Sequence, residues 1–133
     1  MPPEQAEIRR WLEKALHDRS AVDKLFGPDC VEIDVAAFHC QQAVEKTLKA
    51  FLVSRNVAFE KVHDLGYLLD HWTTVDSDFE SLRESVEPLT LFAVAFRYPG
   101  PADPTRRDVE PALHVVERVW EFVTSRLPPA VVP

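Results

Sequence analysis

Gly-Pro pairs divide this chain into segments. Only three glycines occur in 133 residues, and two of them, Gly27 and Gly100, stand directly before a proline. Glycine suits the position just after a helix and proline cannot continue a helix, so each pair predicts a helix end. Between these breaks, apolar residues recur at spacings of three and four, which is the period of an amphipathic helix. No segment alternates apolar and polar residues between turn signals, so the pattern predicts an all-α fold.

Four main helices and one short helix account for the periodic segments. The short connections between them favour an up-and-down antiparallel helical bundle. Pro88 lies inside one periodic segment and is expected to kink it, because proline cannot donate the backbone hydrogen bond of a helix. The expected helices cover residues 4–26, residues 30–55, a short stretch from 65 to 72, a segment that begins at 77, and a last segment that ends at 127.

Polar residues at the segment ends predict how the helices begin and end. Ser, Thr or Asp with an acidic residue three positions later is the pattern of a capping box, in which two side chains satisfy free backbone donors. Asn suits the left-handed conformation that terminates many helices. The expected boxes are Asp29 with Glu32, Ser77 with Glu80 and Thr105 with Asp108, while Asp64 is expected to cap the short helix and Asn56 to terminate the second helix.

Length and composition fit one globular domain. The chain is 46% apolar and 28% charged, and 133 residues suit a single core. We expect one helical bundle domain over residues 1–127 and a frayed tail over residues 128–133. No apolar run reaches the roughly 20 residues of a membrane helix, and the first residues lack the layout of a signal peptide. We therefore expect a cytoplasmic protein with no membrane association.

The net charge of −7 restricts nucleic-acid binding. A protein that binds nucleic acid over its whole surface is excluded, because phosphate contacts dominate that affinity and need basic residues. RNA binding would need a local basic patch, for which Arg9, Arg10 and Lys14, or Arg106 and Arg107, are the candidates. Ordinary solvated helix faces are the alternative explanation of both groups.

Neither the cysteines nor the carboxylates indicate a metal site. Cys30 and Cys40 are expected on one helix, about 15 Å apart along its axis, which is too far for a disulfide. Both are expected to be small buried residues, and their spacing does not match a zinc site. A carboxylate-bridged metal site needs two Glu-x-x-His pairs on facing helices, and only Glu60 to His63 has this spacing, in a loop. We expect no metal and no cofactor.

The stretch FHCQQAVEKTLKAFL, residues 38–52, combines strong helix formers with many polar residues. On a helical wheel Gln41 falls inside the apolar face, with Glu45 at its margin beside Lys49. Gln41 then needs partners, because a buried unpaired amide costs about 1–3 kcal/mol. Alternatively, Gln41 caps a kink or a loop, and Glu45 and Lys49 form a surface pair. The expected apolar face holds Ala37, Cys40, Val44, Leu48, Phe51 and Leu52, the opposite edge Ala36, Ala43 and Ala50, and the open arc His39, Gln42 and Lys46.

Three separated motifs are similar to those of one family. The run above, a loop that ends in His-Asp-Leu and a late Arg-Tyr-Pro resemble, in this order, the HEPN family in its prokaryotic single-domain branch. The resemblance covers about residues 8–126. The matching residues are Phe38, Gln41, Gln42, Ala43, Glu45, Lys46, Lys49, Ala50, His63, Asp64, Leu65, Arg97, Tyr98 and Pro99.

The resemblance implies a bundle of four main helices plus a short one, assembled as a homodimer. It also implies a partner, a minimal nucleotidyltransferase encoded nearby, in a two-component or toxin–antitoxin-like system. The ligand that it implies is a nucleotide or RNA. The ligand-binding residues carried over from the matching motifs are Gln41, Gln42, Glu45, Lys49, His63, Asp64, Arg97 and Tyr98.

Catalysis stays open at this point. Some branches of the family are metal-independent RNases that use an Arg followed, after four to six residues, by a His. Arg97 stands at the place of that Arg, but residues 102–104 are Ala-Asp-Pro, so the usual His is missing. Two other pairs, Arg10 with His17 and Arg107 with His114, match by count alone, away from the expected junction.

Two hypotheses of different classes follow. The first is a non-catalytic or weakly active protein that binds the transferase and a nucleotide. The second is an RNase toxin in which Arg97 binds the phosphate and His63 or another residue approaches in space. The structural alternatives are a helix cap with a loop hydrogen bond for His63 and Asp64, and a helix end for Arg97 and Tyr98.

Overall fold

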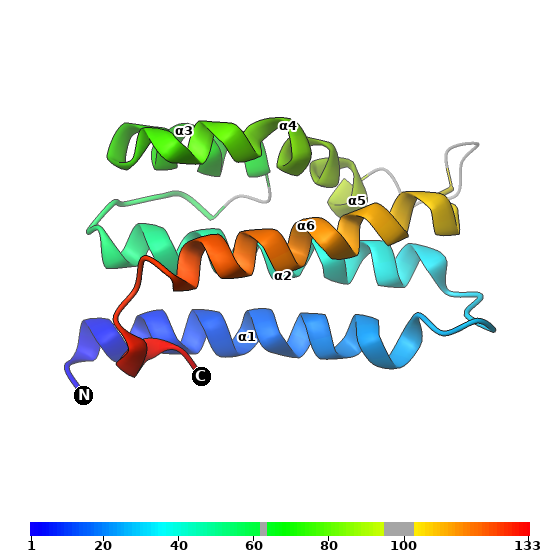
Figure 1. Cartoon of the computed structure of the whole chain (residues 1–133), viewed down its shortest axis with the longest axis horizontal. Helices are drawn as coiled ribbons and strands as arrows, with labels where there is room; N and C mark the ends of the chain where they lie inside the picture. Colours follow the sequence, from blue (N-terminus) through cyan, green and yellow to red (C-terminus); the bar gives the residue numbers. More distant parts are fainter. Residues whose placement is uncertain (62–63, 95–102) are drawn as a thin grey trace.

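The computed structural model describes residues 1–61, 64–94 and 103–133, and these residues form helices and connections without any strand (Figure 1). The expected all-α, up-and-down bundle with a short helix is confirmed. None of the described helices is both long and apolar enough to cross a membrane. The elements are α1 (Pro3–Leu25), α2 (Ile33–Ser54), α3 (Leu65–Val75), η1 (Ser77–Leu82), α4 (Arg83–Val86), η2 (Glu87–Leu89), α5 (Thr90–Val94), α6 (Arg106–Thr124) and η4 (Pro129–Val131).

Helix α1 runs antiparallel to both α2 and α6 (Figure 1). Nη2 of Arg106, in the first turn of α6, donates to the carbonyl of Gly27 just beyond the end of α1, at 2.5 Å. The same guanidinium lies 4.2 Å from the ring centroid of Phe26. At the other end of the bundle, Nη1 of Arg9 donates to the carbonyl of Val132, beyond α6, at 3.3 Å. These contacts join the start of each helix to the end of the other.

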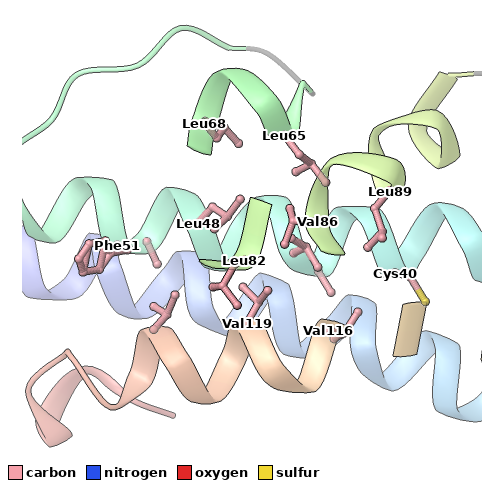
Figure 2. Packing of buried hydrophobic residues seen from close by; sticks show 14 of the residues in the cluster. Cys40, Leu48, Phe51, Leu65, Leu68, Leu82, Val86, Leu89, Val116 and Val119 are labelled. Carbon is pink, nitrogen blue, oxygen red and sulfur yellow. The ribbon is translucent and has the colours of Figure 1, made fainter. Parts of the chain in front are cut away.

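Helix α2 is the centre of the bundle, because it packs against α1, α3, α5 and α6. The face predicted to be apolar, from Ala37 to Leu52, is buried, and so are the three alanines on its opposite edge. Figure 2 shows Leu48 and Phe51 of α2 among side chains from α3, from the turns that follow it and from α6. Burial of one Leu or Phe side chain stabilises the folded state by about 1.5–3 kcal/mol. Because many such side chains surround α2, this helix lies in the centre of the hydrophobic core.

Four aromatic rings join α2, α3, η1 and α6. The ring centroids of Phe51 and Trp72 are 5.4 Å apart, those of Trp72 and Phe79 3.8 Å, and those of Phe79 and Phe122 4.6 Å. Trp72 is fully buried, and its Nε1 donates to the carbonyl of Leu48 at 3.0 Å. The buried indole thus keeps a hydrogen bond while it fills the space between the helices.

The third arm of the bundle, from η1 to α5, is a series of short turns rather than the single kinked helix that the sequence predicted. Pro88 lies in η2, between α4 and α5. Proline has no N–H and its ring crowds the preceding helical turn, which favours the tighter 3₁₀ turns seen here. The arm still buries its apolar stripe, since Phe79, Leu82, Val86 and Leu89 are at most 4% exposed.

Two of the predicted capping boxes are wrong. Helix α2 begins at Ile33, and Glu32, at the capping position, makes no side-chain capping bond. The turn at Gly27 continues until the N–H of Cys30 donates to the Gly27 carbonyl at 3.1 Å, so the helix starts three residues later than expected. In η1 the cap is Asp76, whose carboxylate accepts from the N–H of Asp78 at 3.0 Å.

The other predicted helix ends are confirmed. Asn56 has φ of 57°, the left-handed conformation expected after α2. The N–H of Thr105 donates to Oδ2 of Asp108 at 2.7 Å, which completes the capping box of α6. The carboxylate of Asp64 caps α3. These three helix ends depend only on residues next to the cap, which is why the sequence predicts them.

The last residues turn back onto α1, where a frayed tail was expected. Val131, in η4, is completely buried, and Val132 packs against the core. Nη1 of Arg9 also approaches the carbonyl of Ala130, at 3.4 Å. The prolines restrict the backbone of this segment, so that little conformational entropy is lost when it becomes ordered. Burial of Val131 and Val132 then stabilises its position against α1.

The two cysteines differ in burial. Cys40 is fully buried, whereas Cys30 is only partly buried in the turn before α2, so the expectation of two buried cysteines is correct for Cys40 alone. Burial, and secondarily the negative charge of Asp23, raise the pKa of Cys40 to about 12. Because the thiolate is the reactive form of cysteine, the Cys40 thiol should be inert in the folded protein.

A thiol-reactive disulfide reagent at pH 8 should therefore modify Cys30 rapidly and Cys40 only as the protein unfolds. At that pH a pKa of about 12 leaves roughly one Cys40 thiol in ten thousand ionised. In Cys30→Ser the fast phase should disappear, and in Cys40→Ser it should remain. Two fast thiols in the native protein would show that α2 is not enclosed as described.

Candidate functional site

Four of the candidate residues form a continuous chain of hydrogen bonds along α2. Nε2 of Gln42 donates to Oε1 of Gln41 at 2.6 Å, and Nε2 of Gln41 donates to Oε1 of Glu45 at 3.1 Å. The ammonium of Lys49 donates to Oε2 of Glu45 at 3.1 Å. The exposed fractions are 0% for Gln41, 9% for Gln42, 2% for Glu45 and 6% for Lys49. This polar chain, Gln41–Gln42–Glu45–Lys49, therefore lies inside the bundle.

The burial of the polar chain decides between the two sequence interpretations. Gln42 was expected on the open arc of the helix and is buried, so that expectation is wrong. The Glu45–Lys49 pair is not a surface pair, since its side chains are only 3% and 7% exposed. A helical wheel shows which residues share a face but not how many neighbours cover that face, and four elements surround α2.

Lys49 also contacts two aromatic rings. Its Nζ lies 5.4 Å from the ring centroid of Trp11, on α1, and 5.9 Å from that of Phe59, in the segment after α2. The two rings meet edge to face, with centroids 6.4 Å apart. A cation over aromatic faces is attracted by their quadrupoles, most strongly where water is excluded. Lys49 therefore connects the polar chain to α1 and to the segment that follows α2.

A second polar cluster joins α1 to α2, and the sequence analysis missed it. Asp18 of α1 is 6% exposed. Its Oδ1 lies 2.7 Å from Nδ1 of His39, and its Oδ2 accepts from Nζ of Lys46 at 2.5 Å. The open arc expected for His39 and Lys46 is therefore partly covered by this carboxylate. The available signal was the position of Asp18, three residues after Ala15 and four before Val22, both on the buried face of α1.

The candidate residues His63, Arg97 and Tyr98 lie outside the described residues. Asp64, next to His63, is the N-cap of α3: its Oδ1 accepts from the N–H of Gly66 at 2.8 Å and from that of Tyr67 at 3.3 Å. This confirms the structural alternative proposed for Asp64, because both bonds satisfy free donors of the first helical turn.

A shallow groove of about 510 Å³ lies beside Asp64. Arg83 borders it and forms ion pairs with Asp70 at 2.9 Å, Glu80 at 2.8 Å and Glu87 at 2.9 Å. The hydrogen bonds to Glu80 and Glu87 raise the pKa of Arg83 further above its usual range. Its charge is therefore paired with carboxylates of α3 and of the third arm, which would repel an anionic ligand.

The Arg–His pairs found by count are not brought together. Arg10 and His17 lie on α1, and Arg107 and His114 on α6, so each pair is separated by about 10 Å of helical rise. Within the described ranges, no group of three or more His, Cys, Asp or Glu residues is arranged to hold a metal ion. Neither pair offers the closely spaced acid and base that RNA cleavage requires.

Comparisons with known proteins agree with this architecture. The family model described as HEPN domain matches residues 8–127. Among solved structures, the chain is similar to the crystal structure of TT1696 from Thermus thermophilus, with a TM-score of 0.75 and 29% sequence identity over 92% of this chain and 99% of that chain. No match was found among curated proteins.

Removal of one partner of the buried ion pair should destabilise the protein strongly. In Lys49→Met the carboxylate of Glu45 stays in the core without its cation, which should lower the free energy of unfolding by about 3 kcal/mol. Glu45→Gln should act in the same direction, and the double variant should be less destabilised than the sum of the two. Urea unfolding followed by circular dichroism measures all three.

Glu13→Gln is the matched control, because Glu13 pairs with Arg9 at the same spacing of four residues on the exposed side of α1. Its loss should change the unfolding free energy by less than about 0.5 kcal/mol. If Lys49→Met is no more destabilised than this control, the Glu45–Lys49 pair is not buried in solution.

Proposed function

Because this chain belongs to the HEPN family, we propose that it is a non-catalytic or weakly active binding protein. In this proposal it forms a homodimer, pairs with a minimal nucleotidyltransferase and binds a nucleotide. The two proteins together form a two-component, toxin–antitoxin-like system. The alternative is a metal-independent RNase toxin that uses Arg97 without its usual His.

The observation that supports binding over catalysis is the internal pairing of the charged residues on α2. A catalytic acid or base must be able to exchange a proton with a substrate. Glu45 instead accepts hydrogen bonds from Gln41 and Lys49 inside the bundle. His39 and Lys46, nearer the surface, both contact the carboxylate of Asp18. The contacts of Asp18 join α1 to α2, those of Glu45 lie within α2, and none of these printed contacts positions a reactive group at an open site.

The candidate residues then divide into two roles. Gln41, Gln42, Glu45 and Lys49 support the central helix from within. His63, Arg97 and Tyr98 are proposed as the residues that contact a ligand, beside the capped start of α3 at Asp64. An arginine suits such a role because its guanidinium can bind phosphate oxygens in pairs.

Exposed apolar side chains suggest where a second protein binds. Val31 is 81% exposed, Val35 41% and Leu91 59%. Val31 lies just before α2, Val35 in its first turn, and Leu91 on α5, which packs against α2. Large apolar side chains that gather on one part of a surface often mark an interface. This surface, Val31–Val35–Leu91, is our candidate for the dimer contact.

Light scattering should give twice the chain mass of 15.2 kDa at micromolar concentration. The double variant Val35→Asp/Leu91→Asp should give the monomer mass with unchanged helical content, because two charges would be buried without partners. His114→Asp, an exposed change on α6, should leave the dimer intact. A wild-type monomer would refute the homodimer, and a dimer that tolerates the double variant would refute this location.

Two assays separate binding from RNA cleavage. RNA incubated with the purified protein should remain intact, and RNA incubated with Arg97→Ala should remain intact as well. Co-expression with the product of the adjacent gene should yield a stable complex in which that product is a nucleotidyltransferase. RNA cleavage that disappears in Arg97→Ala would contradict the binding proposal and support the RNase alternative.

A further inference from the structure

The outward face of α1 carries four side chains around one hollow. The hollow has a volume of about 410 Å³ and is lined by Glu7, Arg10, Trp11 and Lys14. Three of these residues are exposed, and Trp11 is half-buried. Glu7 and Lys14 are seven residues apart, about two helical turns, so they lie on one stripe of the helix. The hollow is therefore a surface of α1 alone, with a carboxylate at one end and an ammonium at the other.

The charges on this face are not compensated within the described part of the chain. Arg9 and Glu13, on the same helix, pair with each other at 3.1 Å. In the described ranges the side chains of Glu7, Arg10 and Lys14 form no such pair. Arg10 and Lys14 are four residues apart, a spacing at which like charges repel each other along a helix. This face would therefore gain from a partner that brings both signs of charge.

A second copy of the chain has the required charges at the required spacing. When two identical helices pack antiparallel across a two-fold axis, every contact occurs twice. An axis that passes between Arg10 and Trp11 places Glu7 opposite Lys14 of the second copy. It also brings Arg10 to the level of Trp11 of the second copy, where a guanidinium can lie over the accessible part of the indole. Each of the four residues around the hollow then meets a group that attracts it.

Other arrangements lack this complementarity. Parallel packing across a two-fold axis would place Glu7 against Glu7 and Lys14 against Lys14, and like charges at a contact repel each other. A partner of one sign of charge would satisfy only the carboxylate or only the cations of this face. The order of charges along α1 therefore favours a second copy in the antiparallel arrangement.

We propose that α1 carries a self-association surface, Glu7–Arg10–Trp11–Lys14, which joins two copies antiparallel through two Glu7–Lys14 pairs and two Arg10–Trp11 contacts. One helix face buries less than the roughly 800 Å² per partner of stable interfaces, and exposed ion pairs contribute little. We expect a dissociation constant between about 50 µM and 1 mM. The surface shares no residue with Val31–Val35–Leu91, so dimers formed there associate further when they are concentrated.

Sedimentation equilibrium of the isolated full chain, from about 10 µM to 1 mM at low ionic strength, tests this surface. The mean mass should rise with concentration above the mass of the species present at the lowest concentration. In about 0.5 M salt the dissociation constant should rise by about fivefold or more, because exposed charges are screened. Association that salt does not weaken would overturn the proposal.

Charge reversal separates a specific contact from the effect of net charge. Glu7→Lys and Lys14→Glu should each raise the dissociation constant by about fivefold or more, although they change the net charge in opposite directions. The double variant Glu7→Lys/Lys14→Glu restores both pairs with inverted signs, so its dissociation constant should lie within about twofold of the wild type. Glu110→Lys on α6 and Lys24→Glu at the far end of α1 are exposed matched controls and should change it by less than about twofold.

The proposal is overturned if the mass stays constant up to about 1 mM, if the controls act as strongly as the two reversals, or if the double variant does not recover. Val35→Asp/Leu91→Asp should show the same concentration dependence, starting from the monomer mass. Loss of that dependence in this variant would assign the association to Val31–Val35–Leu91 and also overturn the proposal. A wild-type monomer at micromolar concentration that still associates through α1 would contradict the homodimer alone.

Discussion

The buried ion pair between Glu45 and Lys49 is the interaction on which the surrounding structure depends. Two opposite charges in the core are tolerated only when the geometry is good and their remaining hydrogen-bonding capacity is used. Gln41 meets part of this requirement on the carboxylate side. The rings of Trp11 and Phe59 meet it on the ammonium side. One pair on α2 therefore determines what α1 and the segment after α2 must place next to it.

The same pair links the core to the surface. Trp11 contacts the Lys49 ammonium and also lines a surface hollow of about 410 Å³. The polar chain therefore reaches the surface through Trp11, although none of its four residues lines that hollow.

Much of the fold could be predicted from the sequence because helix signals are local. The apolar period, Asn56 and the Thr105–Asp108 box depend on neighbouring residues only. Two capping boxes failed for local reasons, in the turns at Gly27 and Asp76, whereas the other failures depend on contacts between distant segments. Gln42 was placed in solvent because a wheel cannot reveal the number of neighbours, and Asp18 was overlooked because its partners lie more than 20 residues away. The tail was expected to fray because nothing in PPAVVP indicates the surface of α1 that receives Val131. The sequence placed Gln41, Glu45 and Lys49 next to one another on α2, as their hydrogen bonds show, but it gave no sign of the aromatic rings beside Lys49.

The central claim is that the ammonium of Lys49 is enclosed between Glu45 and two aromatic rings, away from water. Nuclear magnetic resonance of ¹⁵N-labelled protein measures this directly, because the protons of an exposed lysine ammonium exchange too fast with water to be seen at neutral pH. We predict a protected ammonium signal at pH 7 that disappears in Lys49→Arg and persists in Lys14→Arg. Absence of that signal in the folded protein would contradict the account, since it would place the Lys49 ammonium in solvent.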